Sequence, residues 1–188
     1  PNFLTDAQTV RLFEMLARVF HLQPDAEISI EMDPRVATPS QPPLLKSLGF
    51  NRLSMGIQDF DPKVQRAVNR VQGVDHTLGL VTQARSVGFI SVSVDLIYGL
   101  PHQTAESFSR TRELVLQMRP DRLAVYSYAH VPWIKPHQNK MPTEALPTPR
   151  EKLAIFIESL RRFREHGYTA IGLDHLAIPE DDLAVALS

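Results

Sequence analysis

Short apolar runs alternate with longer amphipathic segments along most of the chain. Apolar residues at helical spacing follow Thr5, and a second segment of this kind follows Thr104. Both threonines can cap a helix, and Thr5 with Gln8 has the spacing of a capping box. The pattern therefore predicts helices that begin after Thr5 and Thr104, and the second of these is expected to be amphipathic. Further helices are expected to end at Leu48 and to begin at Asp61, Asp75 and Thr148.

Five short runs of aliphatic, aromatic and β-branched residues lie between these helices and predict strands. The central run begins at Ser91 and is stopped by Gly99 and Pro101, which places Asp95 at the carboxyl end of its strand. The other four cover residues 27–31, 50–55, 122–126 and 169–173. Strands that alternate with helices imply an α/β fold with a parallel sheet. Without an obvious return strand, the sheet is expected to be an arc of a barrel or a doubly wound sheet.

Composition narrows the class of protein. Of the 188 residues, 43% are hydrophobic and 22% are charged, which is typical of a globular chain, and residues 1–188 are expected to form a single domain. The formal net charge of −1 gives no support for a nucleic-acid or membrane-surface role. There is no cysteine, so the chain has no disulfide and no thiolate metal site. The chain begins without Met and ends in an apolar run, and is expected to be an internal piece of a longer protein.

Polar residues follow or end the predicted strands. They are Glu31, Gln58, Asp95, the segment 126–130 and the pair 174–175. The carboxyl ends of parallel strands meet at one edge, where ligands bind in barrels and open α/β sheets. Carboxylates and amides gathered there suit a ligand with hydroxyl or ammonium groups. Alternatively, each of these side chains caps a neighbouring helix.

Other candidates allow two interpretations each. Arg70 could bind a carboxylate with two hydrogen bonds, or form a surface salt bridge. Trp133 and Tyr128, in the aperiodic segment 127–147, could line a flat ligand or anchor the loop. The seven histidines include no pair at the i,i+4 spacing of a helical metal site, so no metal site is expected within the chain.

Six sequence blocks carry a resemblance to a known family. They are IEMDP (30–34), NRLSMGIQDF (51–60), VNR (68–70), VDLIYGLP (94–101), YAHVP (128–132) and GLDH (172–175). In this order they resemble the oxygen-independent coproporphyrinogen III oxidases, which are radical S-adenosylmethionine (SAM) enzymes of haem biosynthesis. The match covers nearly the whole chain. The DP, YAH and DH forms favour the oxidases over their haem-chaperone relatives.

The resemblance implies a partial parallel (β/α)6 barrel that lacks its first βα unit and the C-terminal domain. It implies a cytoplasmic enzyme that converts coproporphyrinogen III to protoporphyrinogen IX by oxidative decarboxylation of two propionates. A [4Fe-4S] cluster, reduced by an electron donor protein, would cleave SAM to a 5′-deoxyadenosyl radical. By matching positions, the implied SAM contacts are Glu31, Gln58, Arg70, Asp95 and Ala129. No residue is assigned a catalytic role.

One departure from the family is large. The cluster motif Cys-x-x-x-Cys-x-x-Cys is absent, so this chain cannot hold the cluster by thiolates, and the isolated chain is expected to be inactive. Two alternatives remain open at this point. One is a haem-binding chaperone of the same superfamily, and the other is a metal-independent barrel that binds a small metabolite.

Overall fold

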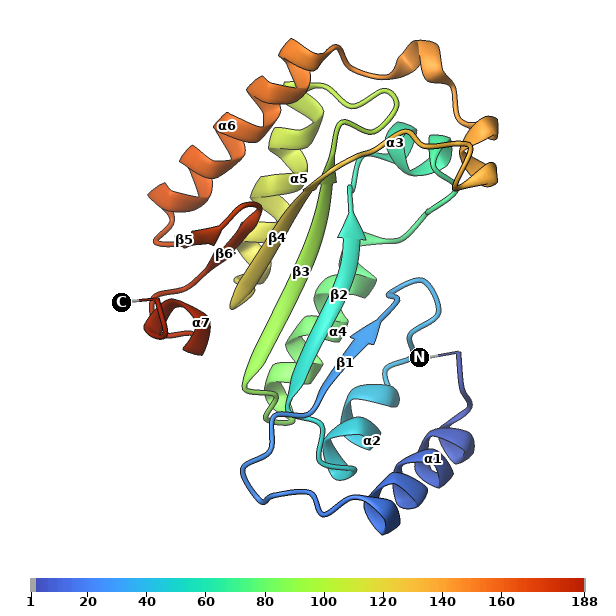
Figure 1. The fold of residues 1–188 in the computed structure, drawn as a ribbon, viewed down its shortest axis with the longest axis vertical. Coiled ribbons are helices and arrows are strands. Elements are labelled where there is room, and N and C mark those ends of the chain that lie inside the picture. Colours follow the sequence, from blue (N-terminus) through green and yellow to red (C-terminus); the bar gives the residue numbers. More distant parts are fainter. Residues whose placement is uncertain (1–2, 188) are drawn as a thin grey trace.

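The computed structural model describes residues 3–187, which form one six-stranded sheet with helices along one of its faces (Figure 1). The strands are β1 (Ser29–Met32), β2 (Arg52–Gln58), β3 (Ser91–Tyr98), β4 (Arg122–Ser127), β5 (Thr169–Gly172) and β6 (His175–Ala177). The helices are α1 (Asp6–Val19), α2 (Gln41–Ser47), α3 (Pro62–Ala67), α4 (Val74–Ser86), α5 (Ala105–Met118), α6 (Pro149–Glu165) and α7 (Asp182–Val185). None of the helices within these residues is long and apolar enough to cross a membrane.

The strand order is β1-β2-β3-β4-β6-β5. Strands β1 to β4 are parallel neighbours, which confirms the mostly parallel α/β sheet expected from the sequence. The expectation of five strands without a return strand was wrong, because β6 pairs antiparallel with both β4 and β5. Leu173, at a left-handed φ of 50°, lies in the short turn that reverses the chain between β5 and β6.

The two faces of the sheet differ because successive side chains of a strand point to opposite sides. On the helix-covered face, Met55, Val94 and Val125 are fully buried. Helices α4 and α5 lie behind the sheet in Figure 1 and cover this face. The opposite face carries polar side chains such as Ser93 and Asp95, and these stay partly exposed. Strands of a parallel sheet that is buried on both faces are apolar throughout, whereas these strands alternate apolar and polar residues. The second face is therefore an open one, available to a ligand.

The helix starts follow the predicted caps in most cases. Thr5 and Thr148 each form a capping box, with Gln8 and Glu151 respectively. Thr104 caps α5 in the same manner. The predicted start of α4 at Asp75 was wrong by one residue, because Gly73 occupies the N-cap and the helix begins at Val74. The Asp75 carboxylate lies in the first turn, where the helix dipole favours a negative charge.

An ionic cluster lies at the amino ends of the strands. Arg122, the first residue of β4, donates from Nε to both oxygens of Asp181 at 2.8 and 2.9 Å. Arg52, the first residue of β2, lies 3.9 Å from Asp181 and also bonds Asp182. Arg52 and Asp181 are both buried. The cluster ties α7 across the amino end of the open face, so access is from the carboxyl ends of the strands.

Strand β1 has an unpaired outer edge within residues 3–187. Beside it, an apolar cavity of about 210 Å³ separates α1 from β1, lined by Leu12, Phe13 and Ile30 among others.

Because exposed strand edges recruit other chains, we expect the isolated 188-residue chain to self-associate through β1. Ser29→Pro, which removes an N–H from this strand, should reduce the mass measured by light scattering. A parent chain that stays monomeric and melts cooperatively would contradict this.

Candidate functional site

Asp95 occupies the middle of the open face of the sheet. The strand register places it between Gly56 on β2 and Ala124 on β4, and Ala124 is in turn opposite His175 on β6. The expected position at the end of the strand was wrong. Strand β3 continues three residues further, to Tyr98, because these residues pair with β4. The Asp95 side chain therefore lies on the open face within the sheet, before the carboxyl end of β3, and its neighbours on the adjacent strands are the small residues Gly56 and Ala124.

The Asp95 carboxyl group has a perturbed acidity. Burial raises its pKa to about 6, and the negative charge of Glu31 adds to the increase, while His175 and Arg70 oppose it. Within residues 3–187 no side chain donates a hydrogen bond to this carboxylate, and its neighbours Arg70 and His175 act on it through their charges. A half-buried carboxyl group without a hydrogen-bond partner is typical of a ligand site.

Gln58 sits at the centre of a tight turn at the end of β2. Its φ is 67°, and the Asp59 N–H donates to the Ile57 carbonyl at 2.9 Å across it. A three-residue turn with positive φ is a strained conformation for a residue with a side chain. The Oε1 atom of Gln58 is buried without a hydrogen-bond partner. This orphaned acceptor is an independent sign that a donor from a ligand belongs there.

Arg70 lies beside Gln58 and is held from two directions. Its Nη2 donates to the Gly56 carbonyl at 2.7 Å and lies 3.6 Å from the Asp33 carboxylate. Its Nε is buried without a hydrogen-bond partner. Burial lowers the pKa of the guanidinium, and the neighbouring acids counteract this effect. Arg70 is therefore a fixed cation that keeps an unused donor, and the interpretation as an exposed surface salt bridge does not apply.

Gly56 makes this arrangement possible, and the sequence analysis did not single it out. A Cβ built on Gly56 would lie 2.6 Å from Gln58 Nε2 and 3.0 Å from Arg70 Nη2. Both side chains therefore cross directly over the backbone of β2. A glycine inside a buried strand indicates such a close approach, and this signal was available in the sequence.

The segment after β4 faces this cluster across a cavity of about 300 Å³, whose lining includes Gln58, Arg70 and Tyr128. Gln138 fixes the backbone of this segment, because its Nε2 donates to the Ala129 carbonyl at 3.0 Å and its Oε1 accepts from Val131 N at 2.6 Å. Sequence reasoning missed Gln138, since its partners are backbone atoms. Trp133 is 76% exposed and neither lines this cavity nor anchors the loop.

His175 and Tyr126 lie on the side of Asp95 that is opposite to Gly56, on strands β6 and β4. His175 Nδ1 lies 2.9 Å from the Asp174 carboxylate. The rings of Tyr126 and His175 meet edge to face, with their centroids 5.7 Å apart. Both belong to the face that carries Asp95, since Ala124 pairs with His175 and Ile97 pairs with Tyr126. Tyr126 lies near the carboxyl end of the parallel strand β4, as expected, whereas His175 reaches the face from the antiparallel strand β6.

The structure brings four of the predicted site residues close together, namely Glu31, Gln58, Arg70 and Asp95. Glu31, Arg70 and Asp95 interact through their charges, and Gln58 lies over the same glycine as Arg70. Ala129 lies in the segment that borders the cavity on the other side, where its exposed methyl group and peptide remain accessible.

Comparison with known proteins gives one family and a set of relatives. The profile of the Radical SAM superfamily matches residues 2–115. Oxygen-independent coproporphyrinogen III oxidases from Escherichia coli and Synechocystis are 48% and 47% identical over 99% of the chain. The chain spans only 41% and 40% of the length of these two relatives. Relatives with these names do not favour the haem-chaperone alternative.

Solved structures agree with the sequence matches. Coproporphyrinogen III oxidase (HemN) from Escherichia coli, described as a radical SAM enzyme, superposes with a TM-score of 0.97 over 99% of this chain and 43% of that chain. Methylornithine synthase, at 17% identity, superposes with a TM-score of 0.57 over 83% of this chain and 42% of that chain, which concerns the fold alone.

Proposed function

The chain belongs to the radical SAM superfamily, and on this basis we propose that residues 1–188 form one domain, the SAM-binding part of the barrel of an oxygen-independent coproporphyrinogen III oxidase. The observation that carries the proposal is the pair of orphaned buried atoms, Gln58 Oε1 and Arg70 Nε, near the half-buried Asp95 carboxylate. The Gln58 and Arg70 side chains both extend over Gly56, which pairs with Asp95 on the open face.

The donors and acceptors present fit SAM. Arg70 is the fixed cation that would bind the methionine carboxylate, and its free Nε–H allows a second hydrogen bond. Asp95 and Glu31 would accept hydrogen bonds from ribose hydroxyls or from the ammonium group. Gln58 would accept from the ligand, and the Ala129 peptide would border the adenine. These residues would bind and orient the molecule, and the ionic cluster of Arg52, Arg122, Asp181 and Asp182 ties α7 to the amino ends of β2 and β4.

The chain has no residue that fits the iron–sulfur cluster. There is no cysteine among its 188 residues, and such clusters are held by thiolates. We therefore place the cluster ligands outside this chain, in the remaining part of a longer protein. Together, the cluster and SAM would supply the radical chemistry that removes hydrogen from the propionates of coproporphyrinogen III. The two oxidative decarboxylations, the electron donor protein and a cytoplasmic location are proposed for that whole protein.

Removal of the Arg70 side chain tests the binding role. In a full-length protein that contains this chain, Arg70→Ala should weaken SAM binding by about 1.5–3 kcal/mol, as expected for a lost hydrogen bond to a charged group. Arg70→Lys should recover part of the affinity, because it restores the charge without the planar fork. Isothermal titration calorimetry measures the affinity, and the cluster absorbance shows that assembly is unaffected. Equal affinity in the parent and Arg70→Ala would remove Arg70 from the site.

A further inference from the structure

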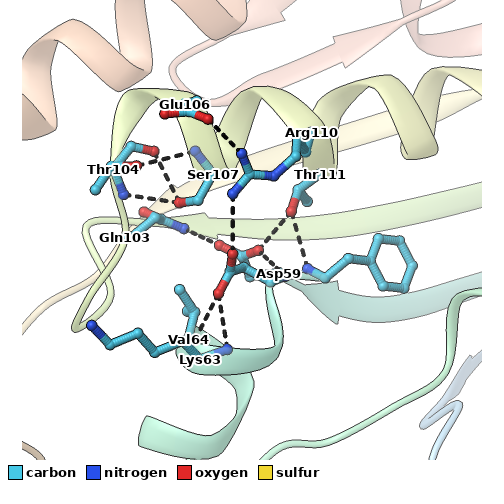
Figure 2. A network of polar contacts seen from close by, with 11 residues as sticks. Asp59, Lys63, Val64, Gln103, Thr104, Glu106, Ser107, Arg110 and Thr111 are labelled. Carbon is cyan, nitrogen blue, oxygen red and sulfur yellow. Dashed lines mark hydrogen bonds and ion pairs between the residues drawn. The ribbon is translucent and has the colours of Figure 1, made fainter.

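A buried polar cluster lies directly behind Gln58, on the side away from the open face. At its centre is Asp59, which is 2% exposed. Its carboxylate accepts hydrogen bonds from the Asp61 N–H at 2.8 Å, from Thr111 Oγ1 at 2.6 Å and from Gln103 Nε2 at 2.6 Å. Figure 2 shows Thr111 and Gln103 converging on Asp59 from α5 and from the loop that precedes it. A buried carboxylate with three donors fixes the backbone on which it stands.

Gln103 has only one orientation that satisfies its neighbours. Its Oε1 accepts from the Gly99 N–H at 2.5 Å, and its Nε2 donates to the Ile97 carbonyl at 3.0 Å as well as to Asp59. Rotation of the amide by 180° would set donor against donor at Gly99 and acceptor against acceptor at Ile97. The amide therefore links the end of β2 to the end of β3 with a defined polarity.

Two more glutamines hold the peptides on either side of Gln58. Gln72 Nε2 donates to the Ile57 carbonyl at 2.6 Å, and Gln65 Nε2 donates to the Asp59 carbonyl at 2.9 Å. Both glutamines are buried. The residues before and after Gln58 are thus each bonded to a side chain from another part of the chain, while the Gln58 amide is left free to face the ligand side.

This arrangement explains how a strained turn persists. A side-chain-bearing residue at positive φ costs about 1–3 kcal/mol and is stable only where its surroundings determine it. We propose that Asp59, through its bond to Gln103, is a positioning residue that holds Gln58 in its turn and sets the Gln58 amide against the ligand. The inference rests on the proposed SAM site and extends it to residues that do not touch the ligand.

The substitution Asp59→Asn separates this role from general core stability. An asparagine at position 59 keeps one oxygen for the Asp61 N–H and the Thr111 hydroxyl, but it presents an NH₂ group to the NH₂ group of Gln103. Because Gln103 cannot turn, the link between β2 and β3 is lost while the remaining bonds to position 59 are kept. The change is isosteric, so the hydrophobic core is unaffected.

The test is a double-mutant cycle between Asp59→Asn and Gln58→Ala in a full-length protein with its cluster, with SAM affinity measured by calorimetry. We expect Asp59→Asn to weaken SAM binding about tenfold in the parent and less than about twofold in the Gln58→Ala background, since its effect passes through Gln58. If Asp59→Asn does not fold by circular dichroism, Gln103→Met breaks the same link and takes its place in the cycle.

Asp61→Asn is the matched control. Asp61 caps α3 through Lys63 N and Val64 N with Oδ1, a role that asparagine keeps. Its Oδ2 lies 3.5 Å from Arg110, whose side chain is 60% exposed, and an exposed ion pair contributes little, so SAM affinity should stay at the parental value. Equal losses for Asp59→Asn in both backgrounds, or no loss in the parent, would overturn the positioning role while the SAM site stands. A parent protein that does not bind SAM would overturn the proposed function and this inference with it.

Discussion

Alanine in place of Gly56 should weaken SAM binding at least tenfold while the fold and the cluster are retained. The new methyl group would stand 2.6 Å from Gln58 Nε2 and 3.0 Å from Arg70 Nη2, so both side chains must leave their positions. Arg70 would then lose its bond to the Gly56 carbonyl and its approach to Asp33. Displacement of a charged donor and an amide together corresponds to about 2–4 kcal/mol of binding free energy.

Gly79→Ala is the control for this prediction. Gly79 lies in α4 with nothing within 4 Å of its added Cβ, so this substitution should leave SAM affinity unchanged and should stabilise the helix by about 0.5–1 kcal/mol. Calorimetry with SAM and a urea unfolding curve measure both quantities for the two variants. A Gly56→Ala protein that binds SAM like the parent would show that Gln58 and Arg70 are not ligands.

Asp95→Asn should stabilise the ligand-free protein at neutral pH and weaken its binding of SAM. Burial raises the Asp95 pKa to about 6 from its ordinary value of 3.8, so the folded state prefers the protonated form. Stability from this group is complete below about pH 4 and is lost as the pH rises to about 6. Above pH 6 the variant avoids this loss, which amounts to about 1–2 kcal/mol after allowing for the solvent that still reaches the carboxyl group.

Urea unfolding without ligand, at pH 4 and at pH 7.5, measures the difference between variant and parent. We expect a gain in the free energy of unfolding at pH 7.5 that shrinks toward zero at pH 4. A difference that is independent of pH would contradict the role of Asp95 ionisation. Loss of SAM affinity in the same variant would show that the ionised carboxylate is retained for binding at the expense of stability.

Local signals in the sequence predicted the elements well. The threonines at 5, 104 and 148 mark helix starts because the cap is formed by residues within one turn. The alternation of strands and helices predicted the four parallel strands for a similar reason, since each βα unit is encoded by consecutive residues. The start of α4 was displaced by one residue, because Gly73 has no side-chain cap to mark it.

Features that depend on distant residues were not predicted. The return strand β6 consists of three residues and lies between β4 and β5, so neither its length nor its partners are visible in a periodic pattern. The proposed ligand residues came from the family resemblance, but the residues that hold them did not. Gln138 binds backbone atoms 7 and 9 residues away, and Asp59 binds side chains 44 and 52 residues away. Such contacts exist only in the assembled fold.

The ionic cluster at the amino ends of the strands also constrains the order in which the chain folds. Arg122 and Asp181 are 59 residues apart in sequence, and Arg52 and Asp182 are 130 residues apart. At about 5–20 residues per second, a ribosome needs roughly 3–12 s to add the partner of Arg122 after Arg122 itself has been made. Strands β1 to β4 are complete by then, with one end of the nascent sheet still open to water. Closure of that end by α7 thus follows the pairing of strands β1 to β4 during synthesis.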